Sequence, residues 1–165
     1  MITKITDKLY LSGYNDATDY PKLVSMGIKQ ILTVGNGMLH RTEELKTKYI
    51  SIEDHSRENI KQHFKDAFEF IDRDVTIVHC AMGISRSATI VIGYLMSGGM
   101  DINYAYQYVK LRRPIINPNS GFTEQLIAYS RELGRYTDKF LFLTDTNEFD
   151  LSNPWDPIDF EKIRF

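Results

Sequence analysis

The chain has 165 residues, of which 42% are hydrophobic and 25% are charged, and its formal net charge is −2. This length fits one domain with one hydrophobic core, and the composition is ordinary for a globular protein. A charge so close to zero does not favour binding to nucleic acid or to an acidic membrane surface across the whole molecule.

A single cysteine rules out an intrachain disulfide, which is typical of proteins from a reducing compartment. Residues 1–4 begin no apolar stretch of signal-peptide length, and position 2 lacks the glycine that myristoylation requires. The longest nearly continuous apolar run, residues 88–96, is too short to span a bilayer. We therefore expect a cytoplasmic or nuclear protein with no attachment to a membrane.

The first elements in chain order are short. Residues 8–13 predict a strand that ends at a glycine, and residues 20–26 predict a helix with Pro21 in its first turn. Residues 30–34 form a β-rich run closed by a glycine-rich turn, and residues 48–52 predict a further strand.

The pattern then changes to alternating helices and strands. Residues 59–73 carry apolar side chains at helical spacing, and residues 75–78 predict a buried strand. Residues 86–96 are apolar on nearly every face, which indicates a helix inside the core. Asp101 is suited to cap another helix, and residues 121–133 predict a last amphipathic one. This alternation indicates an α/β domain with a central sheet.

Residues 134–165 differ in composition from the rest of the chain. They hold seven acidic residues against four basic ones, and they contain seven aromatic residues. A disordered acidic tail usually lacks aromatic residues, so we expect part of this extension to pack on the domain or on a partner. A packed extension without a functional role is the simpler interpretation. The expected organisation is a domain over 1–133 and an acidic, aromatic extension over 134–165.

The segment that indicates chemistry follows the strand at 75–78 and opens the helix at 86–96. A helix N-terminus exposes unpaired N–H groups, so a glycine-containing loop at that point can wrap them around a phosphate. Cys80 at the centre of these groups would have a lowered pKa and act as a nucleophile. Arg86 can offer a planar pair of donors to two phosphoryl oxygens. The candidate phosphate-binding residues are Ala81, Met82, Gly83, Ile84, Ser85 and Arg86.

Other interpretations of these residues exist. A lone cysteine after a strand is commonly a small buried apolar side chain, and the spacing from Cys80 to Arg86 alone is a weak signal. Ser87 can donate to the Cys80 sulfur, or simply form a hydrogen bond at the helix start. His79 fits an orienting or packing role better than that of a base. The combination of histidine, cysteine, glycine, arginine and serine in one strand–loop–helix segment favours catalysis.

This segment resembles the signature H-C-x5-R-[ST] of the protein tyrosine phosphatase superfamily, and its flanks are similar to the dual-specificity branch over residues 5–133. Residues 5–11 look like the opening strand of that branch, and residues 113–126 match the segment that buttresses the helix after the loop. The resemblance implies a phosphatase fold with a mixed, mainly parallel sheet flanked by helices. It also implies that Asn119 forms a hydrogen bond with the phosphate loop, although an ordinary turn residue is an equally good interpretation.

The general acid is assigned by the same resemblance. The branch places its acid five residues before an Asn-Ile or Asn-Leu pair and ten before a phenylalanine. Asp54 meets both criteria, whereas Glu53 and Glu58 meet neither. A loop residue that only caps the following helix would fit Glu58 or Ser56 better.

The resemblance therefore implies hydrolysis of phosphoesters through a cysteinyl-phosphate, with Cys80, Arg86, Asp54 and Ser87 in the reaction. The four histidines are scattered without metal-ligand spacing, and we expect neither a metal nor a cofactor. Because the loop contains no Lys or Arg before Arg86, we expect phosphoprotein substrates. The resemblance to the dual-specificity branch implies that these carry phosphotyrosine and phosphoserine or phosphothreonine. The alternatives are RNA 5′ ends, phosphoinositides, or phosphoprotein binding without catalysis.

Overall fold

A computed structural model describes residues 1–135, so nearly all of the predicted extension lies outside the described residues. The strands are β1 (Thr3–Thr6), β2 (Leu9–Ser12), β3 (Gln30–Val34), β4 (Lys46–Ile50) and β5 (Thr76–His79). The helices are α1 (Tyr14–Ala17), α2 (Tyr20–Ser25), α3 (Phe64–Arg73), α4 (Arg86–Ser97), α5 (Ile102–Arg112) and α6 (Ser120–Glu132), with a 3₁₀ turn, η1 (Lys61–His63), before α3.

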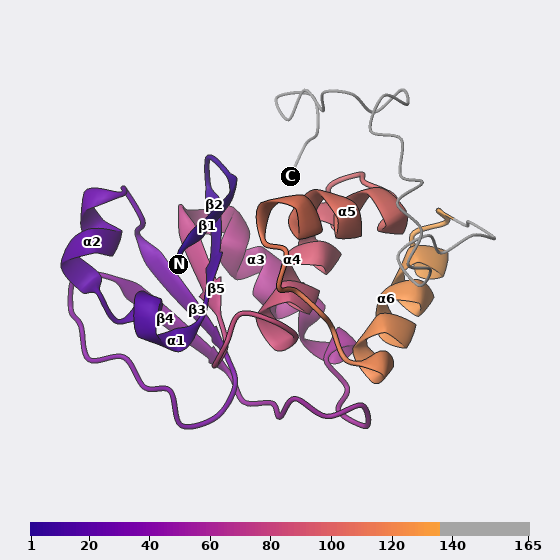
Figure 1. Cartoon of the computed structure of the whole chain (residues 1–165), viewed down its shortest axis with the longest axis horizontal. Coiled ribbons are helices and arrows are strands. Elements are labelled where there is room, and N and C mark those ends of the chain that lie inside the picture. Colours follow the sequence, from indigo (N-terminus) through magenta and orange to yellow (C-terminus); the bar gives the residue numbers. More distant parts are fainter. Residues whose placement is uncertain (136–165) are drawn as a thin grey trace.

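The five strands form one sheet in the order β1-β2-β5-β3-β4 (Figure 1). Strand β5 lies in the middle and pairs in parallel with β2 on one side and β3 on the other. Strand β4 continues the parallel pairing, and only β1 runs antiparallel, next to β2. Central parallel strands are buried on both faces, which explains why every residue of β3 and β5 is buried.

Helices cover both faces of this sheet. The larger core cluster joins the strands to α3, α4, α5 and α6, and the smaller one lies with α2 on the other face (Figure 1). Helix α4 is buried from Ser87 through Met96, which explains its apolar sequence on all sides. None of the helices in residues 1–135 is long and apolar enough to cross a membrane.

The predicted fold class is confirmed, while several boundaries differ. The opening strand expected over residues 5–11 is two strands, because a turn at Asp7 and Lys8 folds β1 back on β2. The strand expected over 48–52 lies two residues earlier, as β4. The helix expected from residue 59 begins at Phe64 after the 3₁₀ turn, and Asn59 instead accepts from the Gln62 N–H. The division of the chain into a domain and an extension stays a prediction.

Candidate active site

The predicted catalytic segment connects the middle strand of the sheet to the core helix. Cys80 follows β5 directly, and Arg86 is the first residue of α4. We call residues 80–86 the phosphate loop. Its position follows from topology, since the carboxyl ends of parallel strands and the N-termini of the helices that follow them meet at one edge of the sheet.

Every backbone carbonyl from Cys80 to Ser85 accepts a hydrogen bond from outside the loop. The donors are the His79 ring for Cys80, the Tyr14 N–H for Ala81, the Arg113 side chain for Met82 and Gly83, the Asn117 N–H for Ile84 and Thr89 for Ser85. In a trans peptide the N–H points opposite to the carbonyl of the same peptide unit. The N–H groups of residues 81–86 are therefore turned toward the inside of the loop, as the sequence analysis expects of a phosphate site.

The Cys80 sulfur lies inside this ring of amides. The Gly83 N–H is 3.3 Å from Cys80 Sγ, and Ser87 Oγ is 3.0 Å from it on the helix side. The cysteine is 2% exposed, so these groups surround the sulfur in place of water. Gly83 permits this geometry because its φ is +67°, and a Cβ at this position would collide with the Ser12 backbone and with Arg113.

The environment of Cys80 favours the thiolate. Burial by itself raises the pKa of the thiol. Hydrogen bonds from the Ser87 hydroxyl and from the N–H groups of Ser87 and Gly83, together with the charge of Arg86, outweigh burial, so the pKa lies below its ordinary value. A thiolate held in this way is a strong nucleophile.

Arg86 supplies the positive charge next to the sulfur. Its Nη1 donates to the Ile52 carbonyl at 3.2 Å, which anchors the guanidinium to the chain just after β4. Among the described residues, Arg86 Nε is a buried donor that has no hydrogen-bond partner. A buried unpaired donor is costly, and an anion in the loop would satisfy it. Two donors on one planar group suit the oxygens of a phosphoryl group.

Arg113 holds the outer side of the phosphate loop. This side chain is 6% exposed; its Nε donates to the Gly83 carbonyl at 2.8 Å and its Nη2 to the Met82 carbonyl at 3.1 Å. Its Nη1 donates to the Met1 carbonyl and to Thr3 Oγ1, so the same guanidinium connects the loop to β1. The sequence predicts for Arg113 only a place in the buttressing segment, because its contact with the Gly83 carbonyl joins residues 30 positions apart.

Asp54 and Asn119 lie together at the rim. Asp54 is exposed, and its Oδ1 accepts a hydrogen bond from Asn119 Nδ2 at 2.9 Å. The Asn119 backbone N–H donates to Ser85 Oγ at 3.0 Å, and its side-chain oxygen caps α6. The contact of Asn119 with the phosphate loop is therefore made by its backbone, while its side chain connects the Asp54 loop to α6.

Two further contacts hold residues 54–58 against α6. Gly121 approaches the Ser56 carbonyl so closely that a Cβ at this position would overlap the Ser56 backbone. Gln125 Nε2 donates to the Glu58 carbonyl at 2.8 Å. A glycine at the start of a helix was the available sequence signal for this close approach.

His79 is fully buried behind the loop. Its Nδ1 lies 3.0 Å from the Cys80 carbonyl, and its Nε2 lies 2.8 Å from Thr33 Oγ1 and 2.7 Å from His40 Nε2. Burial, followed by the nearby charges of His40 and Arg86, lowers the pKa of His79 to about 4. The ring is therefore neutral at neutral pH, and its contact with the Cys80 carbonyl is compatible with the orienting role that the sequence favours. The contact with His40 has no signal in the local sequence.

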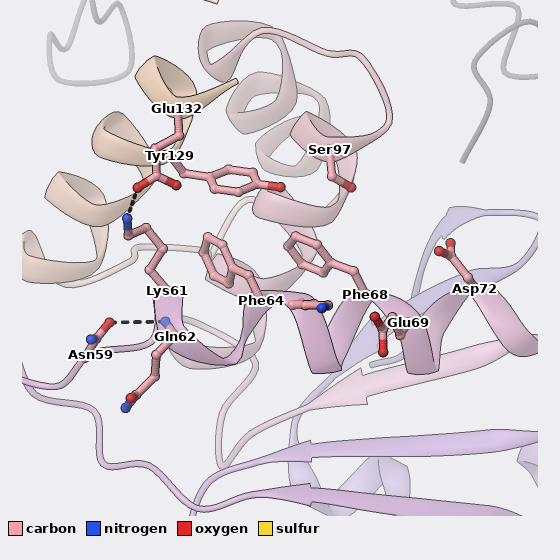
Figure 2. Close-up of a pocket in the computed structure, with 11 residues that line it drawn as sticks. Asn59, Lys61, Gln62, Phe64, Phe68, Glu69, Asp72, Ser97, Tyr129 and Glu132 are labelled. Atoms are coloured by element: carbon pink, nitrogen blue, oxygen red, sulfur yellow. Dashed lines mark hydrogen bonds and ion pairs between the residues drawn. The ribbon is translucent and has the colours of Figure 1, made fainter. Parts of the chain in front are cut away.

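A groove of about 650 Å³ lies on another part of the surface, next to α3 and α6 (Figure 2). Phe64, Phe68 and Tyr129 form its apolar wall, and Lys61 forms an ion pair with Glu132 across it. None of the predicted catalytic residues lines this groove.

Comparisons with known proteins show which family this chain belongs to. The family model described as dual specificity phosphatase, catalytic domain, matches residues 9–132. Dual specificity protein phosphatase 6 of Homo sapiens is 39% identical over 135 residues, which are 76% of this chain and 35% of that protein. Dual specificity protein phosphatase 7 of Homo sapiens is 38% identical over 140 residues, covering 79% of this chain and 33% of that protein. The chain thus spans about a third of these relatives.

A solved structure has a similar fold. The human tyrosine phosphatase-like serine/threonine/tyrosine-interacting protein is 33% identical and superposes with a TM-score of 0.75, over 80% of this chain and 97% of that chain.

Proposed function

Because this chain belongs to the dual specificity phosphatase family, a family of cysteine-dependent phosphatases, we propose that it hydrolyses phosphoproteins at phosphotyrosine and at phosphoserine or phosphothreonine. The reaction runs through a cysteinyl-phosphate intermediate on Cys80. The observation that carries the proposal is the set of consecutive loop carbonyls bound from outside, which turns the loop amides toward the interior, where the Gly83 N–H lies 3.3 Å from Cys80 Sγ. Preorganised donors of this kind stabilise the charge that develops in a transition state.

In the first step the Cys80 thiolate attacks phosphorus. A sulfur–phosphorus bond forms, and the bond between phosphorus and the leaving oxygen breaks. The inward amides and the Arg86 Nε, which has no partner within the protein, support this assignment because they can bind the phosphoryl oxygens. Asp54 gives its proton to the leaving alcohol or phenol.

In the second step a water molecule attacks phosphorus and the sulfur leaves. Asp54, now a carboxylate, takes the proton of this water. Ser87 donates to the departing sulfur, which its Oγ distance of 3.0 Å allows. Asn119 positions Asp54, since its amide holds the carboxylate at the rim through a 2.9 Å hydrogen bond. His79 orients the Cys80 carbonyl and takes no proton.

The substrate class rests on the loop interior. Ala81, Met82, Gly83, Ile84 and Ser85 carry no positive charge, so nothing in the loop itself favours the additional phosphates of an inositol lipid or of a triphosphate RNA end. A phosphorylated side chain of a protein needs only the single phosphate site. The names of the related phosphatases point to the same class.

Substitution of the nucleophile and of the acid tests the mechanism. Cys80→Ser should abolish turnover of a phenyl phosphate, because a serine hydroxyl is not ionised in this site. Asp54→Asn should reduce kcat by about a hundredfold or more, as expected when a general acid is lost. Two measurements check this: steady-state turnover of each variant, and detection of phosphorylated Cys80 by mass spectrometry after the intermediate is trapped. Full activity of Cys80→Ser would refute the mechanism.

A substrate panel tests the substrate class. The purified chain should release phosphate from phosphotyrosine and phosphothreonine peptides, and release little from an RNA 5′ triphosphate or an inositol phospholipid. Greater kcat/KM on RNA or on the lipid would replace the proposed substrate. Tight binding of the peptides without any hydrolysis by the wild-type chain would indicate a phosphoprotein-binding module instead.

A further inference from the structure

A chain of hydrogen bonds runs from the surface of the molecule to the Cys80 carbonyl. The Tyr20 hydroxyl lies 3.0 Å from His40 Nδ1, and His40 Nε2 lies 2.7 Å from His79 Nε2. His79 Nδ1 then lies 3.0 Å from the Cys80 carbonyl oxygen. His40 belongs to the segment between β3 and β4, which is remote in sequence from the phosphate loop.

The hydrogen bond to the Cys80 carbonyl fixes which atom donates and which accepts in each bond of this series. A carbonyl oxygen only accepts, so His79 Nδ1 must carry the proton of that bond. His79 is neutral at neutral pH, so its Nε2 has a lone pair and needs a donor. His40 Nε2–H can donate to this lone pair, and His40 Nδ1 then accepts the Tyr20 O–H. Every nitrogen and oxygen in the chain has one consistent role.

The surroundings of His40 support a fixed ring. His40 is half-buried, and its ring contacts Tyr14, Tyr20, Tyr49 and His79. The His40 backbone N–H also donates to the Tyr49 hydroxyl at 2.9 Å. Burial lowers the pKa of His40, so the neutral form that can both donate and accept is favoured. Outside this group of aromatic rings, the charge of Arg86 also lowers the pKa of His79.

We propose that His40 is a positioning residue that holds His79 in the tautomer with hydrogen on Nδ1, and thereby keeps the Cys80 carbonyl turned away from the sulfur. The role in catalysis rests on the proposed function, whereas the role in the geometry of the loop does not. If the His79 tautomer changed, the Nδ1 lone pair would face the carbonyl lone pairs, and the first carbonyl of the phosphate loop would lose its partner.

Thr33 is the competing donor. Its Oγ1 lies 2.8 Å from the same His79 Nε2, and it is fully buried in β3. A single lone pair can accept one short linear hydrogen bond well, so the two donors share it or one of them dominates. The variants His40→Leu and Thr33→Val separate these possibilities, because each removes one donor.

The test measures the reactivity of Cys80 directly. Iodoacetamide alkylates the thiolate, and Cys80 is the one cysteine of the chain, so the rate of alkylation against pH reports this sulfur alone. His40→Leu should move the inflection of this curve to higher pH and reduce the rate at mildly acidic pH by about fivefold, the usual size for one lost hydrogen bond. His40→Gln should restore most of the rate, because its amide can donate to His79 Nε2.

Two more variants complete the design. Tyr20→Phe removes only the outer hydroxyl. It should move the inflection of the curve to higher pH as well, and reduce the alkylation rate at mildly acidic pH by about twofold. His63→Leu is the matched control, since His63 is also half-buried but lies in η1, and it should leave the curve unchanged. Thermal melting of each variant checks that the compared chains are folded.

The proposal would be overturned if the alkylation rate of His40→Leu followed the wild-type pH curve. It would also be overturned if Thr33→Val, and not His40→Leu, lowered that rate. A His40→Gln variant no better than His40→Leu would show that the ring only fills space. The measurement requires no phosphate ester, so a chain that hydrolyses none of the substrates refutes the proposed function without altering this result.

Discussion

Ser87 places its hydroxyl 3.0 Å from Cys80 Sγ and lies in the first turn of α4. A hydroxyl in this position can stabilise the thiolate of the free protein and the sulfur that leaves in the second step. Removal of the hydroxyl therefore affects both the pH dependence of the first step and the rate of the second.

For Ser87→Ala we expect kcat to fall by about tenfold, with a smaller loss in kcat/KM, since a hydrogen bond to a charged partner is lost. The acidic limb of kcat/KM should move to higher pH, because the Ser87 hydroxyl lowers the pKa of Cys80 and the thiolate would then form only at higher pH. Stopped-flow kinetics should show a burst of released phenol. Ser130→Ala is the control, since Ser130 is a buried serine whose hydroxyl bonds within α6. An unchanged pH profile would mean that Ser87 only supports the start of the helix.

The sequence identifies the site residues whose chemistry is local. Cys80, Arg86 and Ser87 lie within one strand–loop–helix segment, so their proximity follows from the chain itself. His40 and Arg113 were not assigned roles, because their contacts with His79 and Gly83 cross 39 and 30 positions of sequence. Only the sheet order, which brings the ends of β3 and β5 together, makes the histidine contact possible.

At the scale of elements, Arg113 connects the end of α5 to both the phosphate loop and β1. Its guanidinium uses all three nitrogens, with donors in a fixed plane that a lysine ammonium lacks. We expect Arg113→Lys to lower the free energy of unfolding by about 3 kcal/mol, since buried carbonyls lose their partners. The catalytic rate should fall as well. Urea unfolding and kcat/KM measure the two effects.

The neighbouring Arg112→Lys is the control for this change. Arg112 is exposed and stacks on the Tyr108 ring, so its replacement should cost less than about 1 kcal/mol. Equal losses for the two variants would contradict the special role of Arg113.

The start of α6 sets the position of the Asp54 loop. Gly121→Ala would place a methyl group against the Ser56 backbone, so the loop must move and Asp54 with it. We expect about a tenfold loss of kcat on substrates with poor leaving groups, where protonation matters, and a smaller loss on a nitrophenyl phosphate. Ser120→Ala, one residue earlier and exposed, should have no such effect. Equal losses on both kinds of substrate would contradict displacement of the acid.

Element types were easier to predict than element ends. The strand at β3 and the helix at α4 are long or strongly patterned, and their predicted positions agree with the structure. The strand predicted over 8–13 agrees with β2. The strand expected over 5–11 misses the turn at Asp7 and Lys8 between β1 and β2, because this turn contains no glycine or proline. The predicted start of α3 is too early, because Ile60 precedes Phe64 by four residues, a spacing typical of a continuous helix, while η1 itself carries no apolar residue.

At the scale of the whole molecule, α4 connects the parts of the fold. It packs on the sheet, α3, α5 and α6, and it belongs to the larger core cluster. We expect Leu95→Ala to lower the free energy of unfolding by about 3 kcal/mol, through lost burial and the cavity left in the core. Chemical denaturation measures this loss. Leu111→Ala, at a leucine that is 56% exposed, should change it by less than about 0.5 kcal/mol. Similar values for both leucines would contradict the central role of α4.

The outward carbonyls of the phosphate loop also bear on how the chain responds to small anions. Because donors of the protein hold these carbonyls, the amide ring is already formed in the folded chain. Binding of an oxyanion therefore has only a small cost in conformational entropy. Such an anion binds the folded chain and not the unfolded one, so mass action makes the fold harder to undo as its concentration rises. Inorganic phosphate, the end product of the proposed reaction, would then slow turnover while protecting the enzyme from denaturation.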